Sequence, residues 1–167
     1  MKTSTKRLVK TALLTALVCV VTMAVKIPSP FKGYLNLGDS MVLLSAFMLS
    51  PLDCFLAAGI GSAMADIFSG YAVYAPATFV IKGCTALIAC LIAKKVLSGK
   101  FKSNLSVLVG GAVGELVMVA GYYLFEGVMY GFAASAVNIL PNMLQGIAGL
   151  VLGTALCVLT KRLKINF

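Results

Sequence analysis

The stretch KKVLSGKFK, residues 94–102, carries four basic residues and lies between two long apolar runs, 77–93 and 105–125. Two further basic clusters lie near the ends of the chain. They are Lys2/Lys6/Arg7/Lys10 and Lys161/Arg162/Lys164. Lys and Arg accumulate in the short cytoplasmic loops of membrane proteins. We therefore expect both termini and the central loop to be cytoplasmic, with an even number of membrane crossings in each half.

The composition agrees with a chain that resides in a lipid bilayer. Hydrophobic residues make up 60% of the 167 residues, and the mean hydropathy is +1.02. A domain of this size cannot hide so much apolar surface from water. The net charge of +9 is concentrated at the flanks of the apolar runs, where membrane orientation and anionic lipid explain it. The sequence therefore does not predict a nucleic-acid partner.

The apolar runs predict an all-α integral membrane protein, a single domain over residues 1–167 with six membrane-spanning helices. The run at 40–50 is short, because about ten residues of helix reach only about 15 Å, half the hydrocarbon thickness. An even number of spans still requires it, so we expect a helical hairpin that turns at Pro51. The expected spans are approximately 8–27, 40–50, 52–69, 77–95, 105–126 and 136–160.

Small residues recur at a spacing of four along three of these spans. The pairs are Ala12/Ala16, Gly110/Gly114 and Gly149/Gly153. Small residues at this spacing let helices approach closely within a bilayer.

Metal and cofactor chemistry is not expected. The chain has no histidine, and its five cysteines lie in or beside apolar runs without a Cys-x-x-Cys pair. The common zinc sites cannot be built from these residues. We expect no metal and no cofactor, and cysteines that pack as small hydrophobic side chains.

Charged residues within the predicted spans need a partner or a polar cavity. Asp66 and Lys82 each lie about 6–8 Å below the outer end of their helices, at matching depths. They form either a structural ion pair or part of a ligand pocket. Glu115, Tyr122 and Glu126 share one helical face that rises from the midplane to the outer surface. Without a basic partner at its depth, Glu115 would have to be protonated or meet a ligand donor.

Amide side chains lie on one face of the last span, at Asn138, Asn142 and Gln145. They either bond neighbouring helices or recognise a heterocycle. The loops 34–39 and 70–76 lie above these groups. Their tyrosines either anchor the helices at the interface or help to close a polar pocket.

Several short stretches resemble the substrate-binding S components of energy-coupling factor (ECF) vitamin transporters. They are GYLNLGD at 33–39, Pro51, AD at 65–66, GY at 70–71, YAPAT at 74–78 and KG at 82–83. The resemblance covers essentially the whole chain and is strongest to the branch for riboflavin, hydroxymethylpyrimidine or pyridoxine. Because the chain lacks tryptophan and histidine, a site of the thiamine type is not expected.

The resemblance implies a multi-pass subunit of the prokaryotic plasma membrane that captures a vitamin or vitamin precursor from outside. It would work with a transmembrane coupling subunit and two cytoplasmic ATPases. The ATPases would hydrolyse ATP, since no Walker motif occurs here. Ala12 and Ala16 match the alanine pattern with which the family's first helix contacts the coupling subunit.

The expected substrate site combines the two outer loops with the polar spans. We expect Asn36 and Asp39, with Tyr71 and Tyr74, to close over the ligand, and Asp66 to orient Lys82. The remaining expected contacts are Lys82, Glu115, Tyr122, Asn138, Asn142 and Gln145.

Two other function classes are weaker. An enzyme is not expected, because the chain contains neither an HExxH motif nor a Ser–His arrangement. A stand-alone small-solute transporter or channel is the alternative, although the spans carry no charged rings that would line a pore.

Overall fold

The computed structural model describes residues 2–28, 34–96 and 104–163, and within them the chain forms a bundle of helices. The helices are α1 (Lys2–Ala24), α2 (Gly38–Met48), α3 (Pro51–Phe68), α4 (Ala75–Leu91), the π-helical turn η1 (Ile92–Val96), α5 (Asn104–Tyr130), α6 (Phe132–Ala136) and α7 (Ile139–Arg162). Two short strands, β1 (Lys26–Pro28) and β2 (Tyr34–Asn36), form an antiparallel hairpin. Within these described ranges, five helical segments are long and apolar enough to cross a membrane, and α2 is apolar but shorter.

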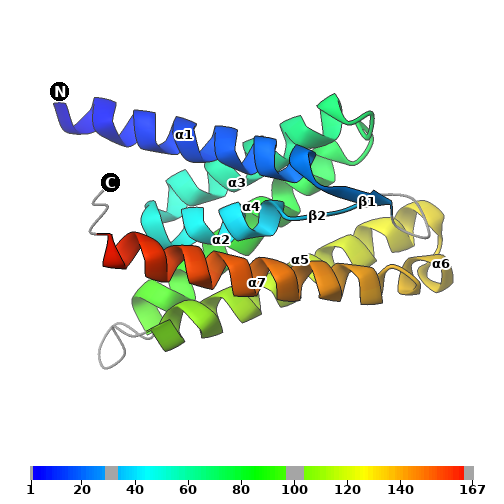
Figure 1. Cartoon of the computed structure of the whole chain (residues 1–167). Coiled ribbons are helices and arrows are strands. Elements are labelled where there is room, and N and C mark those ends of the chain that lie inside the picture. The colour runs from blue at the N-terminus through cyan, green and yellow to red at the C-terminus, as the bar shows by residue number, and fades with distance from the viewer. Residues whose placement is uncertain (1, 29–33, 97–103, 164–167) are drawn as a thin grey trace.

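The two ends of the bundle differ in character (Figure 1). The start of α1, the start of α5 and the end of α7 gather at one end, which is where the basic clusters lie in the sequence. The β1–β2 hairpin and α6 lie toward the opposite end. We call these the basic end and the hairpin end. Sequence reasoning assigns the basic end to the cytoplasm.

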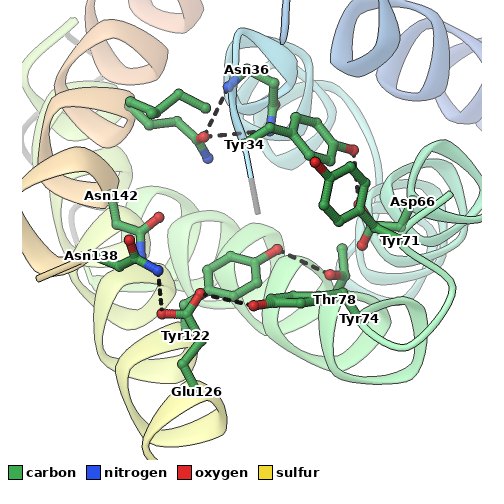
Figure 2. Close-up of a pocket in the computed structure, with 12 residues that line it drawn as sticks. Tyr34, Asn36, Asp66, Tyr71, Tyr74, Thr78, Tyr122, Glu126, Asn138 and Asn142 are labelled. Carbon is green, nitrogen blue, oxygen red and sulfur yellow. Dashed lines mark hydrogen bonds between the residues drawn. The ribbon is translucent and has the colours of Figure 1, made fainter. Parts of the chain in front are cut away.

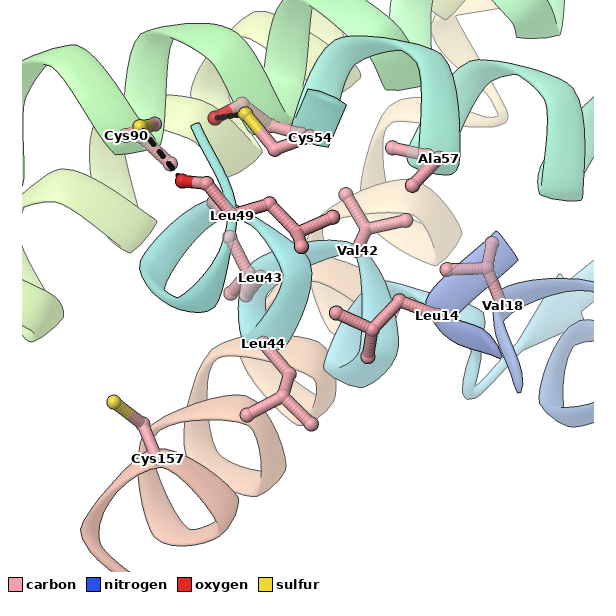
Figure 3. Packing of buried hydrophobic residues seen from close by; sticks show 14 of the residues in the cluster. Leu14, Val18, Val42, Leu43, Leu44, Leu49, Cys54, Ala57, Cys90 and Cys157 are labelled. Atoms are coloured by element: carbon pink, nitrogen blue, oxygen red, sulfur yellow. Dashed lines mark hydrogen bonds between the residues drawn. The ribbon is translucent and has the colours of Figure 1, made fainter. Parts of the chain in front are cut away.

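Helix α2 forms the centre of the bundle and packs against α1, α3, α4 and α7. Its side chains Val42, Leu43 and Ala46 are fully buried, and they meet Leu14 and Val18 of α1 in the main apolar cluster (Figure 3). A helix enclosed by other helices does not need to reach across the hydrocarbon layer, which explains its 11 residues. The chain then turns at the predicted position, where Pro51 opens α3 in the first helical turn.

The structure corrects several predicted boundaries. The first helix ends at Ala24 rather than near Ile27, and the chain continues as β1. Two prolines at 28 and 30 prevent helix continuation, and pairing with β2 satisfies backbone groups that a bare loop would leave open. Helix α2 starts at Gly38, so Asp39 belongs to its first turn and not to the loop. Helix α5 extends to Tyr130.

Two of the predicted small-residue pairs pack inside the bundle. A Cβ atom on Gly110 would lie 2.7 Å from the carbonyl oxygen of Ala89 in α4. A Cβ atom on Gly149 would lie 2.5 Å from the Cβ atom of Asp39 in α2. Ala12 and Ala16, in contrast, are exposed on the outer face of α1.

Polar contacts close the basic end around the α2–α3 turn. Arg7 donates two hydrogen bonds to Asp53, at 2.6 Å and 2.9 Å. Ser50 donates to the same carboxylate at 2.6 Å, and the Lys94 ammonium donates to the carbonyl oxygen of Leu49. The basic clusters therefore fasten the helix ends together as well as carrying the orientation signal.

All the acidic side chains are buried within the bundle. The chain has five Asp and Glu residues, and the structure buries every one of them. They are Asp39, Asp53, Asp66, Glu115 and Glu126.

Candidate functional site

A polar pocket lies at the hairpin end, between β2, α3, α4, α5 and α7 (Figure 2). Its volume is about 40 Å³, which is room for only a few water molecules. A vitamin-sized ligand therefore requires the pocket to open wider. The lining residues are Tyr34, Leu35, Asn36, Asp66, Tyr71, Tyr74, Thr78, Tyr122, Glu126, Asn138, Asn142 and Gln145.

Strand β2 closes one side of the pocket. The backbone N–H of Asn36 donates to Gln145 Oε1 at 2.9 Å, and the Tyr34 hydroxyl donates to Asp66 Oδ1 at 2.8 Å. The Tyr34 ring packs against Tyr71 with 5.0 Å between centroids. Burial, followed by the charge of Asp66, raises the pKa of Tyr34 well above its ordinary value. Tyr34 therefore remains a hydrogen-bond donor throughout the physiological pH range.

Helices α4, α5 and α7 supply the opposite wall. Asn138 Nδ2 donates to Glu126 Oε2 at 2.9 Å, and the Tyr74 hydroxyl donates to Glu126 Oε1 at 3.5 Å. The Tyr122 hydroxyl donates to Thr78 at 3.2 Å. These contacts explain why Glu126 can be buried inside α5, although the sequence placed it at the exposed end of a span.

Every Asp, Glu, Lys or Arg side chain among the described lining residues is acidic. The lining contains the carboxyl groups of Asp66 and Glu126, and none of its twelve residues is basic. The second oxygen of Asp66, Oδ2, is buried without a hydrogen-bond partner of normal geometry, although the Thr78 hydroxyl interacts with the same carboxylate. The pocket therefore offers acceptor capacity that its own side chains do not fill.

A buried ion pair lies beneath the pocket, between Lys82 of α4 and Asp39 of α2. Gln145 Nε2 donates to the other oxygen of Asp39 at 2.7 Å. Lys82 Nζ lies 5.4 Å from the centroid of the Tyr122 ring, which lines the pocket. The ion pair is thus connected to the pocket through Gln145 and Tyr122.

The expected pairing of Asp66 with Lys82 is wrong. Because α2 begins at Gly38, its first turn carries Asp39 into the centre of the bundle, where Asp39 pairs with Lys82. Asp66 instead accepts the hydroxyl of Tyr34. Matching depth along two helices does not fix toward which neighbour each helix turns its side chains.

The structure brings most of the predicted ligand contacts together. Seven line the pocket: Asn36, Tyr71, Tyr74, Tyr122, Asn138, Asn142 and Gln145. Asp39 and Lys82 form the ion pair beneath it. Glu115 lies outside the pocket lining and is buried, with neither carboxyl oxygen hydrogen-bonded. Asp66, expected only as a supporting residue, lines the pocket directly.

Although the sequence indicated the loop 34–39 and the helical face of Glu126 as parts of the site, the predicted ligand contacts left out four lining residues. They are Tyr34, Leu35, Thr78 and Glu126. Tyr34 and Leu35 stand in the GYLNLGD motif, and Thr78 follows Tyr74 by one helical turn. Placing Tyr34 and Leu35 would have required knowing that β2 is a strand, whose side chains alternate between its two faces. Placing Glu126 would have required knowing that α5 continues beyond it to Tyr130.

A bundle of apolar helices with a polar pocket at one end is the architecture of a membrane-embedded small-molecule binding protein. The family model described as "ECF-type riboflavin transporter, S component" matches residues 2–163. The chain therefore belongs to the family of S components of ECF-type riboflavin transporters.

Similar proteins agree with this assignment. A solved structure described as the S component of a bacterial ECF transporter superimposes with a TM-score of 0.73 at 25% identity, covering 96% of each chain. The "Thiamine precursor transporter HmpT" of Lactococcus lactis subsp. cremoris is 28% identical over 162 residues, 96% of this chain and 90% of the relative. An uncharacterised protein of Pyrococcus woesei is 36% identical over 147 residues, 87% of this chain and 95% of the relative.

The family membership establishes the class of function. The protein is a membrane-embedded, substrate-binding subunit of an ECF-type transporter, and it is not an enzyme. It associates with an ECF module and binds a small molecule.

Proposed function

We propose that this subunit captures a small vitamin or vitamin precursor that is neutral or positively charged, in the pocket at the hairpin end. The observation that carries the proposal is the charge of the lining, with two carboxyl groups and no basic side chain among its twelve residues. Burying an anion next to Asp66 and Glu126 would add like-charge repulsion to the cost of desolvation. A ligand with N–H or O–H donors would instead complete the unfilled acceptors.

The aromatic side chains of the pocket favour a flat ring. Tyr34, Tyr71, Tyr74 and Tyr122 all line it, and tyrosine rings stack on heterocycles while their hydroxyls form directed hydrogen bonds. The amides of Asn142 and Gln145 can both donate and accept. A nitrogen heterocycle such as hydroxymethylpyrimidine, pyridoxine or riboflavin has this combination of a flat ring and donor groups.

The size of the pocket favours a single ring within this group. A cavity of about 40 Å³ must widen for any of these ligands, and a one-ring precursor needs less widening than the three fused rings of riboflavin. The likeness to a thiamine precursor transporter supports a precursor, whereas the family model carries the name of riboflavin.

The proposed partners are a transmembrane coupling subunit and two cytoplasmic ATPases. Ala12 and Ala16 lie exposed on α1, and they are not used for packing inside the chain. Small residues on a free helix face permit close approach of a second membrane helix. We assign this face to contact with the coupling subunit.

Ligand identity is tested by native mass spectrometry of the purified protein, followed by binding measurements with hydroxymethylpyrimidine, pyridoxine and riboflavin. We expect one of these to bind tightly without being converted. Its phosphorylated derivative should bind much more weakly, because the twelve described lining residues offer the phosphate two carboxyl groups and no basic side chain. Equal or tighter binding of the phosphorylated form would contradict the proposed charge preference.

Asp66→Asn should weaken ligand binding about 10- to 100-fold, the usual effect of losing one hydrogen bond to a charged group. The amide introduced by this substitution can still accept the Tyr34 hydroxyl through its carbonyl oxygen, so the hairpin contact is preserved. The measurement is isothermal titration of the ligand chosen above.

The matched control is Asp53→Asn, the same chemical change at the basic end. Asp53 bonds Arg7 and Ser50, far along the bundle from the lining. We expect this variant to lose some stability and to keep its ligand affinity. If both variants bound the ligand as the unaltered protein does, Asp66 would not be a ligand contact.

A further inference from the structure

The Glu115 carboxyl group is buried near the middle of α5, and neither of its oxygens has a hydrogen-bond partner. It does not line the polar pocket. An unpaired carboxyl group at this depth is costly in a membrane protein. It lines instead an apolar groove of about 220 Å³ between α5 and α7, whose other side chains cannot hydrogen-bond the carboxyl group. Its position therefore needs a reason other than packing alone.

The ion pair beneath the pocket faces this carboxyl group. Glu115 interacts electrostatically with both Asp39 and Lys82. A Cβ atom on Gly149 would lie 2.5 Å from the Asp39 Cβ atom and 3.3 Å from Glu115 Oε1. The two acidic side chains thus meet at Gly149, and Lys82 bonds only one of them in this structure.

The hairpin is linked to Asp39 through very few residues. Asn36 of β2 accepts the backbone N–H of Gly38 at 2.8 Å, and Asp39 is the next residue of α2. The N–H of Asn36 also bonds Gln145, which in turn donates to Asp39. A movement of the hairpin away from α7 would break the Asn36–Gln145 hydrogen bond and would act on Asp39 through the adjacent residue Gly38.

We propose that Glu115 is the second partner of Lys82, and that it receives the Lys82 ammonium when the hairpin opens to admit the ligand. The opening itself rests on the proposed function, because a pocket of about 40 Å³ must widen to accept a ligand. Glu115 then keeps Lys82 paired in the open state. In the open state the Asp39 carboxylate still accepts a hydrogen bond from the Gln145 amide, and it also accepts hydrogen bonds from water that enters the pocket. Glu115 is a positioning residue in this scheme, without contact to the ligand.

The first test is a double-mutant cycle on the ligand-free protein, with Asp39→Asn and Glu115→Gln and with unfolding measured in detergent. Asp39→Asn leaves Lys82 a carboxyl partner in Glu115, whereas the double variant leaves it none. We expect the unfolding equilibrium constant of the double variant to exceed the product of the two single effects by about tenfold or more. If the change in the unfolding equilibrium constant of the double variant equalled the product of the two single changes, the proposal would be overturned.

The control pair combines Asp39→Asn with Glu126→Gln. Glu126 lies on the same helix as Glu115 but is bonded to Asn138 and Tyr74. The change in the unfolding equilibrium constant of this double variant should equal the product of the two single changes. An excess equal to that of the Glu115 pair would show general loss of packing and would also overturn the proposal.

The second test measures ligand kinetics in Glu115→Gln, which remains informative if Asp39→Asn fails to fold. Loss of the second partner makes the open state rarer, so association and dissociation should slow by the same factor, about tenfold, with Kd unchanged. A changed Kd that arises from dissociation alone would make Glu115 a ligand contact and refute the proposal. If no ligand is found, the proposed function fails, and the double-mutant cycle still decides the role of Glu115.

Discussion

Lys82→Met should lower the free energy of unfolding by about 3–5 kcal/mol, the usual cost of removing one partner of a buried ion pair. Asp39 is fully buried. In the variant Gln145 would still donate to the Asp39 side chain, but no ammonium group would balance its negative charge. Methionine has nearly the length of the lysine stem, so packing changes little and the effect reports on charge. Reversible unfolding of the ligand-free protein in detergent measures it.

Two further variants make this expectation specific. Lys26→Met removes an exposed cation that donates to Ser69, and it should cost less than about 1 kcal/mol. Adding Asp39→Asn to Lys82→Met removes both charges and should recover most of the lost stability. If Lys82→Met were as mild as Lys26→Met, or if Asp39→Asn gave no recovery, the pair would not be the stabilising contact that we infer.

Ala12→Trp and Ala16→Trp should reduce ATP-driven uptake to the background of cells that lack the subunit. A tryptophan on the exposed face of α1 prevents the close helix approach that small residues permit. Ligand affinity should be unchanged, because neither residue lines the pocket. Uptake in cells and binding to the purified subunit are measured on the same variants.

The control for these variants is Val151→Trp on α7, whose side chain is 61% exposed. It places the same bulk on a different outer face of the bundle and should leave uptake intact. Normal uptake by the two α1 variants would remove this face as the contact for the coupling subunit. Loss of ligand binding in them would indicate misfolding rather than uncoupling.

The sequence predicted the positions of the helices along the chain well, because hydropathy and basic flanks are local properties of the sequence. Apolar runs and basic flanks indicated most helix ends to within about four residues, except the start of α1. The turn at Pro51 followed from the short run before it. The tyrosines at 71 and 74 and the amides of the last span were expected in the site, and they line the pocket.

Partner choice across helices was not predictable in the same way. Asp66 and Lys82 were predicted to lie at matching depths, yet Lys82 pairs with Asp39. The rotation of α2 about its axis decides this, and that rotation depends on how Gly149 lets α7 approach Asp39. The hairpin was missed for a related reason, since three-residue strands are too short to show an alternating pattern.

The burial of all five acidic side chains has a consequence for how the protein meets its membrane. Side-chain charge on the outside has a single sign, so anionic lipid headgroups attract the protein and find no carboxylate side chain to repel them. Added salt can then only weaken this attraction, and more anionic lipid can only strengthen it. The attraction between the subunit and anionic headgroups should therefore rise monotonically with lipid charge, without an optimum at an intermediate composition.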